Sequence, residues 1–283
     1  MKMKELNIGV IQMKSEPGKY QENMDKVKAM IADCAAKNCQ LVCLPEAFAT
    51  TIDFGALPGI AQSIPGEITD ALSRLARKYG IDIIAGILEA VEENIYSSVA
   101  YIDSGGSIRS VYRRVNVYEL EKKFLAKGNE LAIVNTKWGK IGLLGGYDIN
   151  FPEVCRRYFE EKTELMVCLC QIPDTFLTST VTIAKARASE NNCYFVLASN
   201  IGKNGLARID FMGNSMITQG GDVFDFASGE YIPQEEILAI AGQEETVLTA
   251  RLNMRRKNLE IVRNPHMLDK RADYSSLEVK YAE

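Results

Sequence analysis

The sequence of 283 residues contains one histidine, His266, and no Cys-x-x-Cys pair among its seven cysteines. Zinc sites and catalytic Ser-His or Cys-His pairs depend on such residues, so both kinds of site are disfavoured. We therefore expect no metal and no cofactor. The cysteines are odd in number and lie mostly in apolar stretches, which favours reduced thiols in a cytoplasmic protein over a disulfide framework.

Long apolar runs and a strong net charge are also missing. No run approaches the roughly 20 apolar residues of a membrane-spanning helix. Residues 1–13 show no apolar core of a signal peptide. The net charge of −4 argues against a nucleic-acid-binding surface. Because 47% of the residues are hydrophobic, the chain can bury a substantial core. We expect no nucleic acid and no membrane among its partners.

Helical and strand-like patterns alternate along both halves of the chain. Apolar periodicity predicts helices at 21–37, 67–79, 152–161 and 178–192, and strands at 5–13, 41–44, 81–88, 131–135, 141–144, 165–170, 194–199 and 246–252. Two antiparallel hairpins are expected, 95–103 with 107–112 and 212–218 with 223–226. Together these patterns predict an α/β fold with two mixed sheets. No linker or repeat divides the chain, so we expect one domain over 1–283.

The most informative segment is 140–153, KIGLLGGYDINFPE. Its apolar beginning reads as a buried strand, and Pro152 suits the first turn of a helix. Between them, Gly145 and Gly146 are expected to let the backbone turn sharply. A strand, a tight turn and a helix in this order are a common place to display a nucleophile.

This segment resembles the nucleophile turn of the nitrilase (carbon–nitrogen hydrolase) superfamily, Gly-x-x-x-Cys-Tyr-Asp-x-x-Phe-Pro-Glu. The matched residues are Gly142, Tyr147, Asp148, Phe151, Pro152 and Glu153. Gly146 stands at the cysteine position. The resemblance extends over nearly the whole chain. It implies a four-layer α-β-β-α sandwich with a C-terminal arm over about 253–283.

Family members use a glutamate as general base, a lysine for the oxyanion and a cysteine that forms a thioester. The segment 41–46, LVCLPE, resembles the strand end that presents the base, which assigns that position to Glu46. Glu121, followed by Phe124 and Gly128, resembles a second glutamate that orders the site. The segments 185–192 and 198–202 resemble the family's Arg-Ala-x-Glu-Asn region, and 213–221 and 265–273 its last hairpin and arm.

Two of the three catalytic positions depart from the family. The motif Tyr-Arg-Lys-x-His is here Tyr112-Arg113-Arg114-Val115-Asn116, so Arg114 replaces the lysine. Gly146 offers no side chain for attack, and removing such a nucleophile can reduce turnover on the order of 10⁶-fold. We therefore interpret the chain as a pseudoenzyme with a binding or regulatory role.

Two alternatives stay open. One is a working hydrolase of a small amide or nitrile, using Glu46 with a water molecule or an unrecognised nucleophile. The other is a structural partner of an active paralogue. Cys170 ends an apolar strand beside the expected pocket, and Cys168 faces the same side, so a replacement thiol has to be considered. By position, Tyr147, Asp148 and Cys170 would line the substrate site, with Asp148 best interpreted as a hydrogen-bonded turn residue.

Arg114 is expected to meet Glu46 and Glu121. Either the two acids neutralise Arg114 and the pocket closes, or the Arg114 guanidinium stays partly free and binds a small amide- or carboxylate-bearing molecule. We favour closure, because two acids outnumber one base, and we expect a small gap above Gly146.

A homodimer is also expected, because the family that this chain resembles pairs through the helices corresponding to about 152–161 and 178–192. The helices at 152–161 and 178–192 carry Val154, Tyr158, Phe159, Val181 and Ile183, more apolar side chains than one buried face absorbs.

Overall fold

The computed structural model describes residues 5–204, 209–220, 223–225, 228–232 and 235–254. Within this part, the first sheet has six strands. From one edge to the other they are β16 (Thr246–Asn253), β1 (Glu5–Gln12), β2 (Leu41–Cys43), β3 (Asp82–Val91), β4 (Asn94–Ile102) and β5 (Ile108–Arg113). The pairs β1–β2 and β2–β3 are parallel, and the others are antiparallel.

The second sheet follows the same plan. In the described residues its six strands are, in order, β15 (Ile237–Ile240), β12 (Met216–Thr218), β9 (Tyr194–Ser199), β8 (Leu165–Cys170), β7 (Lys140–Gly145) and β6 (Ala132–Asn135). Its centre, β7–β8–β9, is parallel and its outer pairs are antiparallel. Two small hairpins lie outside both sheets: β10 (Ile201–Asn204) with β11 (Ile209–Met212), and β13 (Val223–Asp225) with β14 (Glu230–Ile232).

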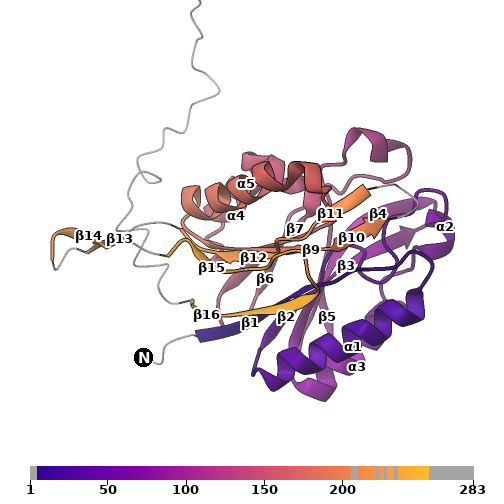
Figure 1. Cartoon of the computed structure of the whole chain (residues 1–283), viewed down its shortest axis with the longest axis horizontal. Helices are drawn as coiled ribbons and strands as arrows, with labels where there is room; N and C mark the ends of the chain where they lie inside the picture. Colours follow the sequence, from indigo (N-terminus) through magenta and orange to yellow (C-terminus); the bar gives the residue numbers. More distant parts are fainter. Residues whose placement is uncertain (1–4, 205–208, 221–222, 226–227, 233–234, 255–283) are drawn as a thin grey trace, which may run out of the picture.

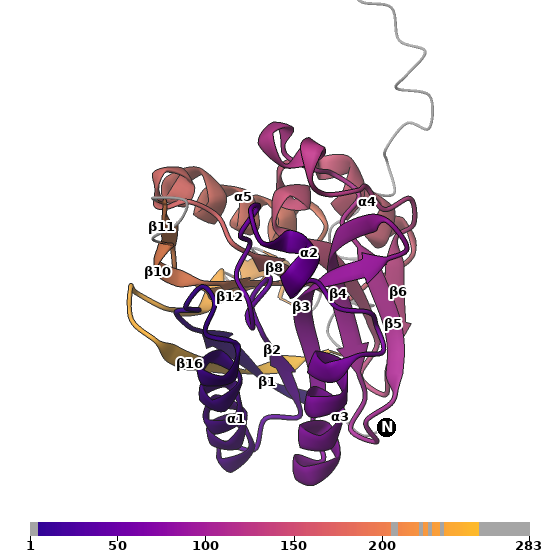
Figure 2. The same cartoon turned by 90° about the vertical axis from the view of Figure 1, so that its right-hand side faces the viewer.

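Helices cover the outer face of each sheet, and the two sheets pack against each other (Figure 1). The helices α1 (Tyr20–Ala36) and α3 (Glu67–Tyr79) lie on the first sheet, and α4 (Pro152–Glu160) and α5 (Leu177–Glu190) on the second. Figure 2 shows the same layers from the side. A short helix α2 (Leu57–Ile60) and the 3-10 helices η1 (Glu119–Lys123), η2 (Gly146–Asn150) and η3 (Asp174–Phe176) belong to the connections. The fold is the expected four-layer α-β-β-α sandwich with two mixed sheets.

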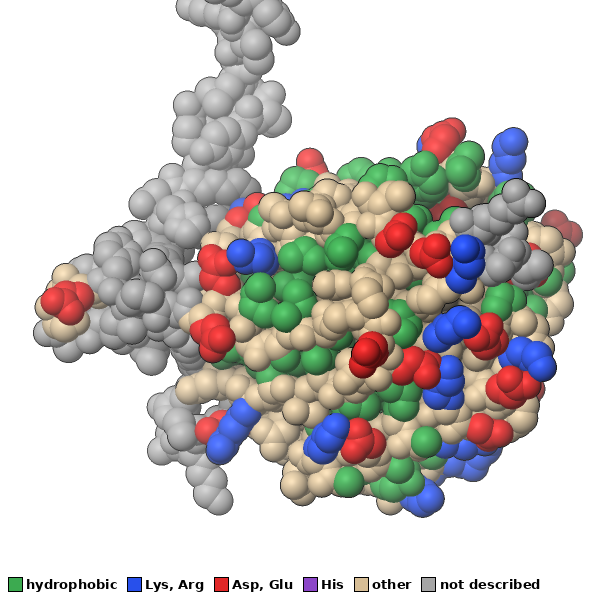
Figure 3. Space-filling model, in the orientation of Figure 1, with side chains coloured by type: hydrophobic (Ala, Val, Ile, Leu, Met, Phe, Trp, Pro, Cys, Tyr) green, Lys and Arg blue, Asp and Glu red, His purple; other side chains and the backbone are tan. Residues whose placement is uncertain are grey.

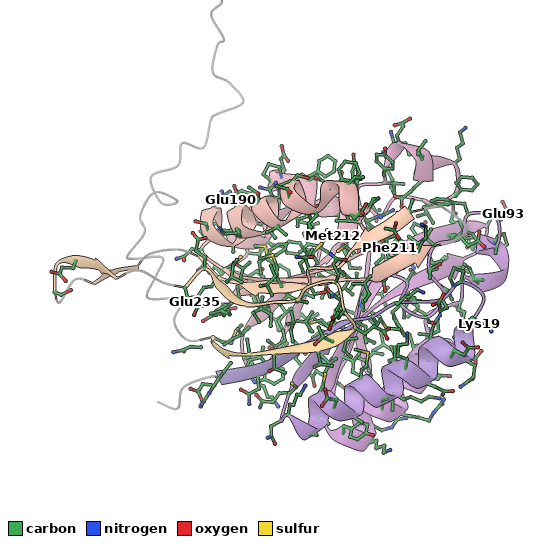
Figure 4. The ribbon with its side chains drawn as sticks, viewed as in Figure 1. Lys19, Glu93, Glu190, Phe211, Met212 and Glu235 are labelled. Carbon is green, nitrogen blue, oxygen red and sulfur yellow. The ribbon has the colours of Figure 1, made fainter. Side chains whose placement is uncertain are left out.

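Alternation along the strands builds the core. In β8, Leu165, Val167 and Leu169 point between the sheets, whereas Cys168 and Cys170 point toward α4 and α5. This period of two is the ordinary geometry of a strand, and it places Cys168 and Cys170 on one face as expected. Figure 4 shows that side chains fill the space between the layers.

Most predicted elements are confirmed, but the second hairpin is wrong. β12 pairs with β9 and β15, and β13 pairs with β14. Two strand-like stretches separated by glycines predict a local hairpin. In the described part of the structure, β12 instead pairs with β9, which is distant in sequence, and does not pair with β13. The C-terminal arm beyond residue 254 and His266 lie outside the described residues.

Candidate functional site

The residues singled out by sequence meet where several strands end. Glu46 follows β2, Arg114 follows β5, and Gly146 follows β7 at the start of η2. Glu121 comes from η1. Because β2 and β7 are central parallel strands of the two sheets, their carboxyl ends bring Glu46 and Gly146 to the same end of the sandwich.

Glu46 is held on both carboxylate oxygens. Oε1 accepts hydrogen bonds from the Ser97 hydroxyl and from Arg114 Nη1, the latter at 3.1 Å. Oε2 accepts from the backbone N–H of Gln171 at 3.1 Å. The Glu46 backbone carbonyl accepts from Asn200 Nδ2 at 2.8 Å. With 3% of its surface exposed, Glu46 is a buried carboxylate whose orientation four other residues determine.

Arg114 lies between the two glutamates. Nη1 pairs with Glu46 and Nη2 with Glu121, and the guanidinium side chain is 3% exposed. Burial alone lowers the pKa of Arg114, but the charges of Glu46 and Glu121 outweigh burial and raise it. For Glu121, burial raises the pKa against the attraction of Arg114. The contact expected for Arg114 is present, and it forms an internal cluster of two acids and one base.

The two glycines of the turn are required for close packing. A Cβ on Gly146 would lie 2.9 Å from Glu46 Oε2 and 2.9 Å from Cys170 Cβ. A Cβ on Gly145 would lie 2.8 Å from both Cδ and Cγ of Arg114. The chain turns between β7 and η2 at these glycines, as the sequence predicted, but Gly145 has an ordinary φ of −94°, so close packing rather than backbone conformation accounts for glycine here. The expected gap above Gly146 is absent, because an added methyl carbon would lie only 2.9 Å from its nearest neighbours.

Asp148 is engaged by the protein on both oxygens. Oδ1 accepts from the backbone and side-chain nitrogens of Asn116 at 2.9 and 3.0 Å. Oδ2 accepts from the Tyr112 hydroxyl at 2.5 Å and from the Gly145 N–H at 3.1 Å. Burial raises the pKa of Asp148 even against these donors. These contacts make Asp148 a residue that fastens η2 to the end of β5.

Tyr147 lies in a row of aromatic rings next to the ion cluster. Its ring meets Tyr118 and Phe151 edge to face, each with centroids 5.4 Å apart. Tyr118 is 43% exposed. Tyr147 therefore packs among aromatic side chains beside the site.

The thiols of Cys168 and Cys170 are fully buried. Burial raises the pKa of both thiols, so neither has the character of a ready thiolate. The Cys168 thiol donates to the carbonyl of Gly145 at 3.5 Å, which holds it against the turn.

Sequence reasoning missed the residues that orient Glu46. Ser97, Gln171 and Asn200 come from β4, the end of β8 and the segment after β9. Serine, glutamine and asparagine occur in any connection or strand, and only the packing of the two sheets brings these three to Glu46.

The described residues contain no group of three or more His, Cys, Asp or Glu side chains that could hold a metal ion. Among them, no helix is long and apolar enough to cross a membrane.

The family model for carbon–nitrogen hydrolases matches residues 7–256. Among curated proteins, the omega-amidase NIT2 of Xenopus tropicalis is 28% identical over 267 residues, covering 89% of this chain and 90% of that protein. The omega-amidase NIT2 of Homo sapiens is 26% identical over 276 residues, covering 92% of this chain and 93% of that protein.

Solved structures share the fold. Nit3 of Saccharomyces cerevisiae, a member of the nitrilase superfamily, superimposes with a TM-score of 0.82 at 21% identity, covering 95% of this chain and 97% of that one. A carbon–nitrogen hydrolase from Helicobacter pylori gives a TM-score of 0.83 at 20% identity, covering 97% and 98%. With its two mixed sheets, its outer helices and a family match over most of its length, this chain belongs to the carbon–nitrogen hydrolase family.

Proposed function

We propose that this chain has lost thiol-dependent hydrolysis of carbon–nitrogen bonds and acts as a binding or regulatory member of its family. The packing around Gly146 carries this proposal. Gly146 supplies no nucleophile, and the position of its missing Cβ is within 2.9 Å of Glu46 and Cys170. An acyl-enzyme has no attacking atom to form on there.

The Glu46–Arg114–Glu121 cluster supports closure of the ancestral pocket. Two carboxylates already surround the guanidinium, so a ligand carboxylate would have to displace one of them. This favours a role through a protein partner, including an active paralogue, over a small amide- or carboxylate-bearing ligand in this pocket. A thermal-shift screen of small carboxylates, amides and ureas tests the second role directly.

The alternative is a working hydrolase that uses Glu46 with water or another nucleophile. The relatives named omega-amidase support this alternative, because they are similar to this chain over most of its length. Against it, both oxygens of Glu46 accept hydrogen bonds from protein groups, and Cys170 is a fully buried thiol with a raised pKa.

Ammonia release decides between these two functions. The purified chain should release no ammonia above buffer rates from a panel of ω-amides, N-carbamoyl compounds and nitriles. Turnover at ordinary enzyme rates, ~1 s⁻¹ or more, would refute the loss of hydrolysis.

A restoring variant tests whether the rest of the site is intact. Arg114→Lys combined with Gly146→Cys returns the family's two residues and frees Glu46 from the guanidinium. We expect measurable amide hydrolysis from the double variant and none from Gly146→Cys alone, because Arg114 still pairs with both glutamates there.

We further propose a cytoplasmic homodimer. The seven cysteines are all free and buried, as in a reducing compartment. Val154 and Tyr158 are buried under α4, but Phe159, Val181 and Ile183 stay half-buried on the outer layer. Figure 3 shows hydrophobic side chains gathered over the region of α5 and the neighbouring strands. Light scattering should give a dimer, and a monomer at all concentrations would contradict it.

A further inference from the structure

The C-terminal end of α1 brings two cysteines together. The backbone N–H of Cys39 donates to the carbonyl of Cys34 at 3.0 Å, and that of Asn38 to Ala35 at 3.0 Å. Asn38 has a left-handed φ of 59°. These are the paired hydrogen bonds of a Schellman motif, in which the side chains at the positions of Cys34 and Cys39 ordinarily touch.

A glycine in the adjoining strand leaves space for both sulfur atoms. A Cβ on Gly9, in β1, would lie 2.9 Å from Cys34 Sγ and 3.1 Å from Cys39 Sγ. The two sulfurs therefore share one small space over the backbone of Gly9, and both are free thiols. The helix end fixes the backbone on either side of them, so the pair is already arranged for contact.

The two thiols differ in access and acidity. Cys34 is fully buried, whereas Cys39 is 7% exposed and lines a surface hollow of about 590 Å³ with Asn7, Gln40 and Tyr79. A hydrogen bond from Cys34 lowers the pKa of Cys39 against its burial, and the charge of Lys37 lowers it further. The same hydrogen bond, with burial, raises the pKa of Cys34. Cys39 is thus the thiol that meets solvent and ionises first.

We propose that Cys34 and Cys39 form a reversible modification site that hydrogen peroxide converts to a disulfide. The Cys39 thiolate attacks one peroxide oxygen, the O–O bond breaks, and the departing hydroxide takes up one proton and leaves as water. Cys39 is then a sulfenic acid. The Cys34 sulfur attacks it, the S–O bond breaks, and the departing hydroxide takes the Cys34 proton as a second water. Two thiols lose two electrons, and one peroxide gains them.

This site is separate from the ion cluster. Cys39 precedes β2 and Glu46 follows it, so the two sites lie at opposite ends of the same strand. Disulfide formation between Cys34 and Cys39 therefore does not depend on whether this chain hydrolyses carbon–nitrogen bonds.

Peptide mapping of the full chain tests the proposal. Trypsin cleaves after Lys37, which separates Cys34 on peptide 29–37 from Cys39 on peptide 38–74. After hydrogen peroxide and alkylation, we expect these two peptides linked, with the mass of two hydrogens lost, and separated again by dithiothreitol. Peptide 38–74 also carries Cys43, which points between the sheets. Cys43→Ala should keep the link, and Cys39→Ser should lose it.

A sulfenic-acid trap tests the order of attack. In Cys34→Ser, dimedone should label Cys39 after peroxide, whereas in Cys39→Ser it should leave Cys34 unlabelled. The wild-type chain alone is sufficient if a variant fails to fold, because the link either forms or does not. Unlinked peptides after peroxide, or a link that survives Cys39→Ser, would overturn the proposal.

Discussion

One hairpin of the first sheet carries two similar clusters on opposite faces. Ser98 and Arg113 hold Glu89: the hydroxyl donates at 2.7 Å, and Nε and Nη2 of the guanidinium each donate at 2.8 Å. Ser97 and Arg114, one residue away on each strand, hold Glu46. Successive residues of a strand point to opposite faces, so neighbouring residues build both clusters.

The two clusters differ in charge balance and access to water. Arg113 meets one glutamate, is 41% exposed and lies over the ring of Tyr96. Arg114 meets two glutamates and is 3% exposed, and among the hydrogen bonds of the described residues its Nε has no partner. Glu89, Ser98 and Arg113 therefore form an ion pair in which only the arginine reaches the surface. The same three residue types between the sheets, joined by Glu121, form a buried cluster at the candidate site.

Removing the arginines should show the largest difference between the clusters. Arg114→Ala removes the positive charge between Glu46 and Glu121 in a buried place and should reduce the free energy of unfolding by about 3–5 kcal/mol. Arg113→Ala lets water reach Glu89, and we expect a loss of about 1–2 kcal/mol. Urea denaturation of both variants measures the difference. Equal losses would show that Arg114 is no more important for stability than Arg113.

Removing the serines should affect the two clusters alike. Each hydroxyl donates to a carboxylate that is at most 3% exposed, so Ser97→Ala and Ser98→Ala should each cost about 1.5–3 kcal/mol. Chemical denaturation under identical conditions tests this. A much larger effect at Ser97 would mean that the closed site depends on more than its arginine.

Adding one methyl group should test how tightly the surroundings of Gly146 are packed. Gly146→Ala places a Cβ against Glu46 and Cys170, and such overpacking costs about 1–3 kcal/mol. Gly59→Ala is the matched control, because a Cβ there meets nothing within 4 Å. It should be neutral or slightly stabilising in thermal unfolding. A neutral Gly146→Ala would show that the site can open at little cost.

The pH dependence should show the smallest effect. Burial raises the pKa of Glu121 above its ordinary 4.5, so the folded state keeps this proton to a higher pH than the unfolded state does. That contribution to stability is present below pH 4.5 and is lost as the pH rises through the folded-state pKa. Relative to wild type, Glu121→Gln should therefore gain thermal stability as the pH rises above 4.5.

Glu119→Gln provides the control on the same 3-10 helix. A hydrogen bond from Lys122 lowers the pKa of Glu119, so its contribution to stability appears above the unfolded-state value and is lost on acidification. The variant should lose stability relative to wild type as the pH rises. If Glu121→Gln behaved in the same direction, the attraction of Arg114 would dominate over burial at Glu121.

Local sequence patterns by themselves determined the helices, most strands and the family. The helix predicted over 67–79 is α3, because apolar spacing and a left-handed Gly80 mark its face and its end. The strands predicted over 165–170 and 194–199 are β8 and β9 to the residue. These signals act between residues near one another in the chain, where periodicity and turn chemistry are visible.

Only the tertiary structure decided the state of the site. Motif positions identified Glu46, Arg114 and Glu121. The packing of the two sheets brings Ser97 and Gln171 to Glu46 and places other atoms close to Gly146. The misassigned partner of β12 has the same origin, since strand pairing across long sequence separations leaves no local mark. Whether a buried arginine is free to hold a ligand depends on groups that the chain brings to it from elsewhere.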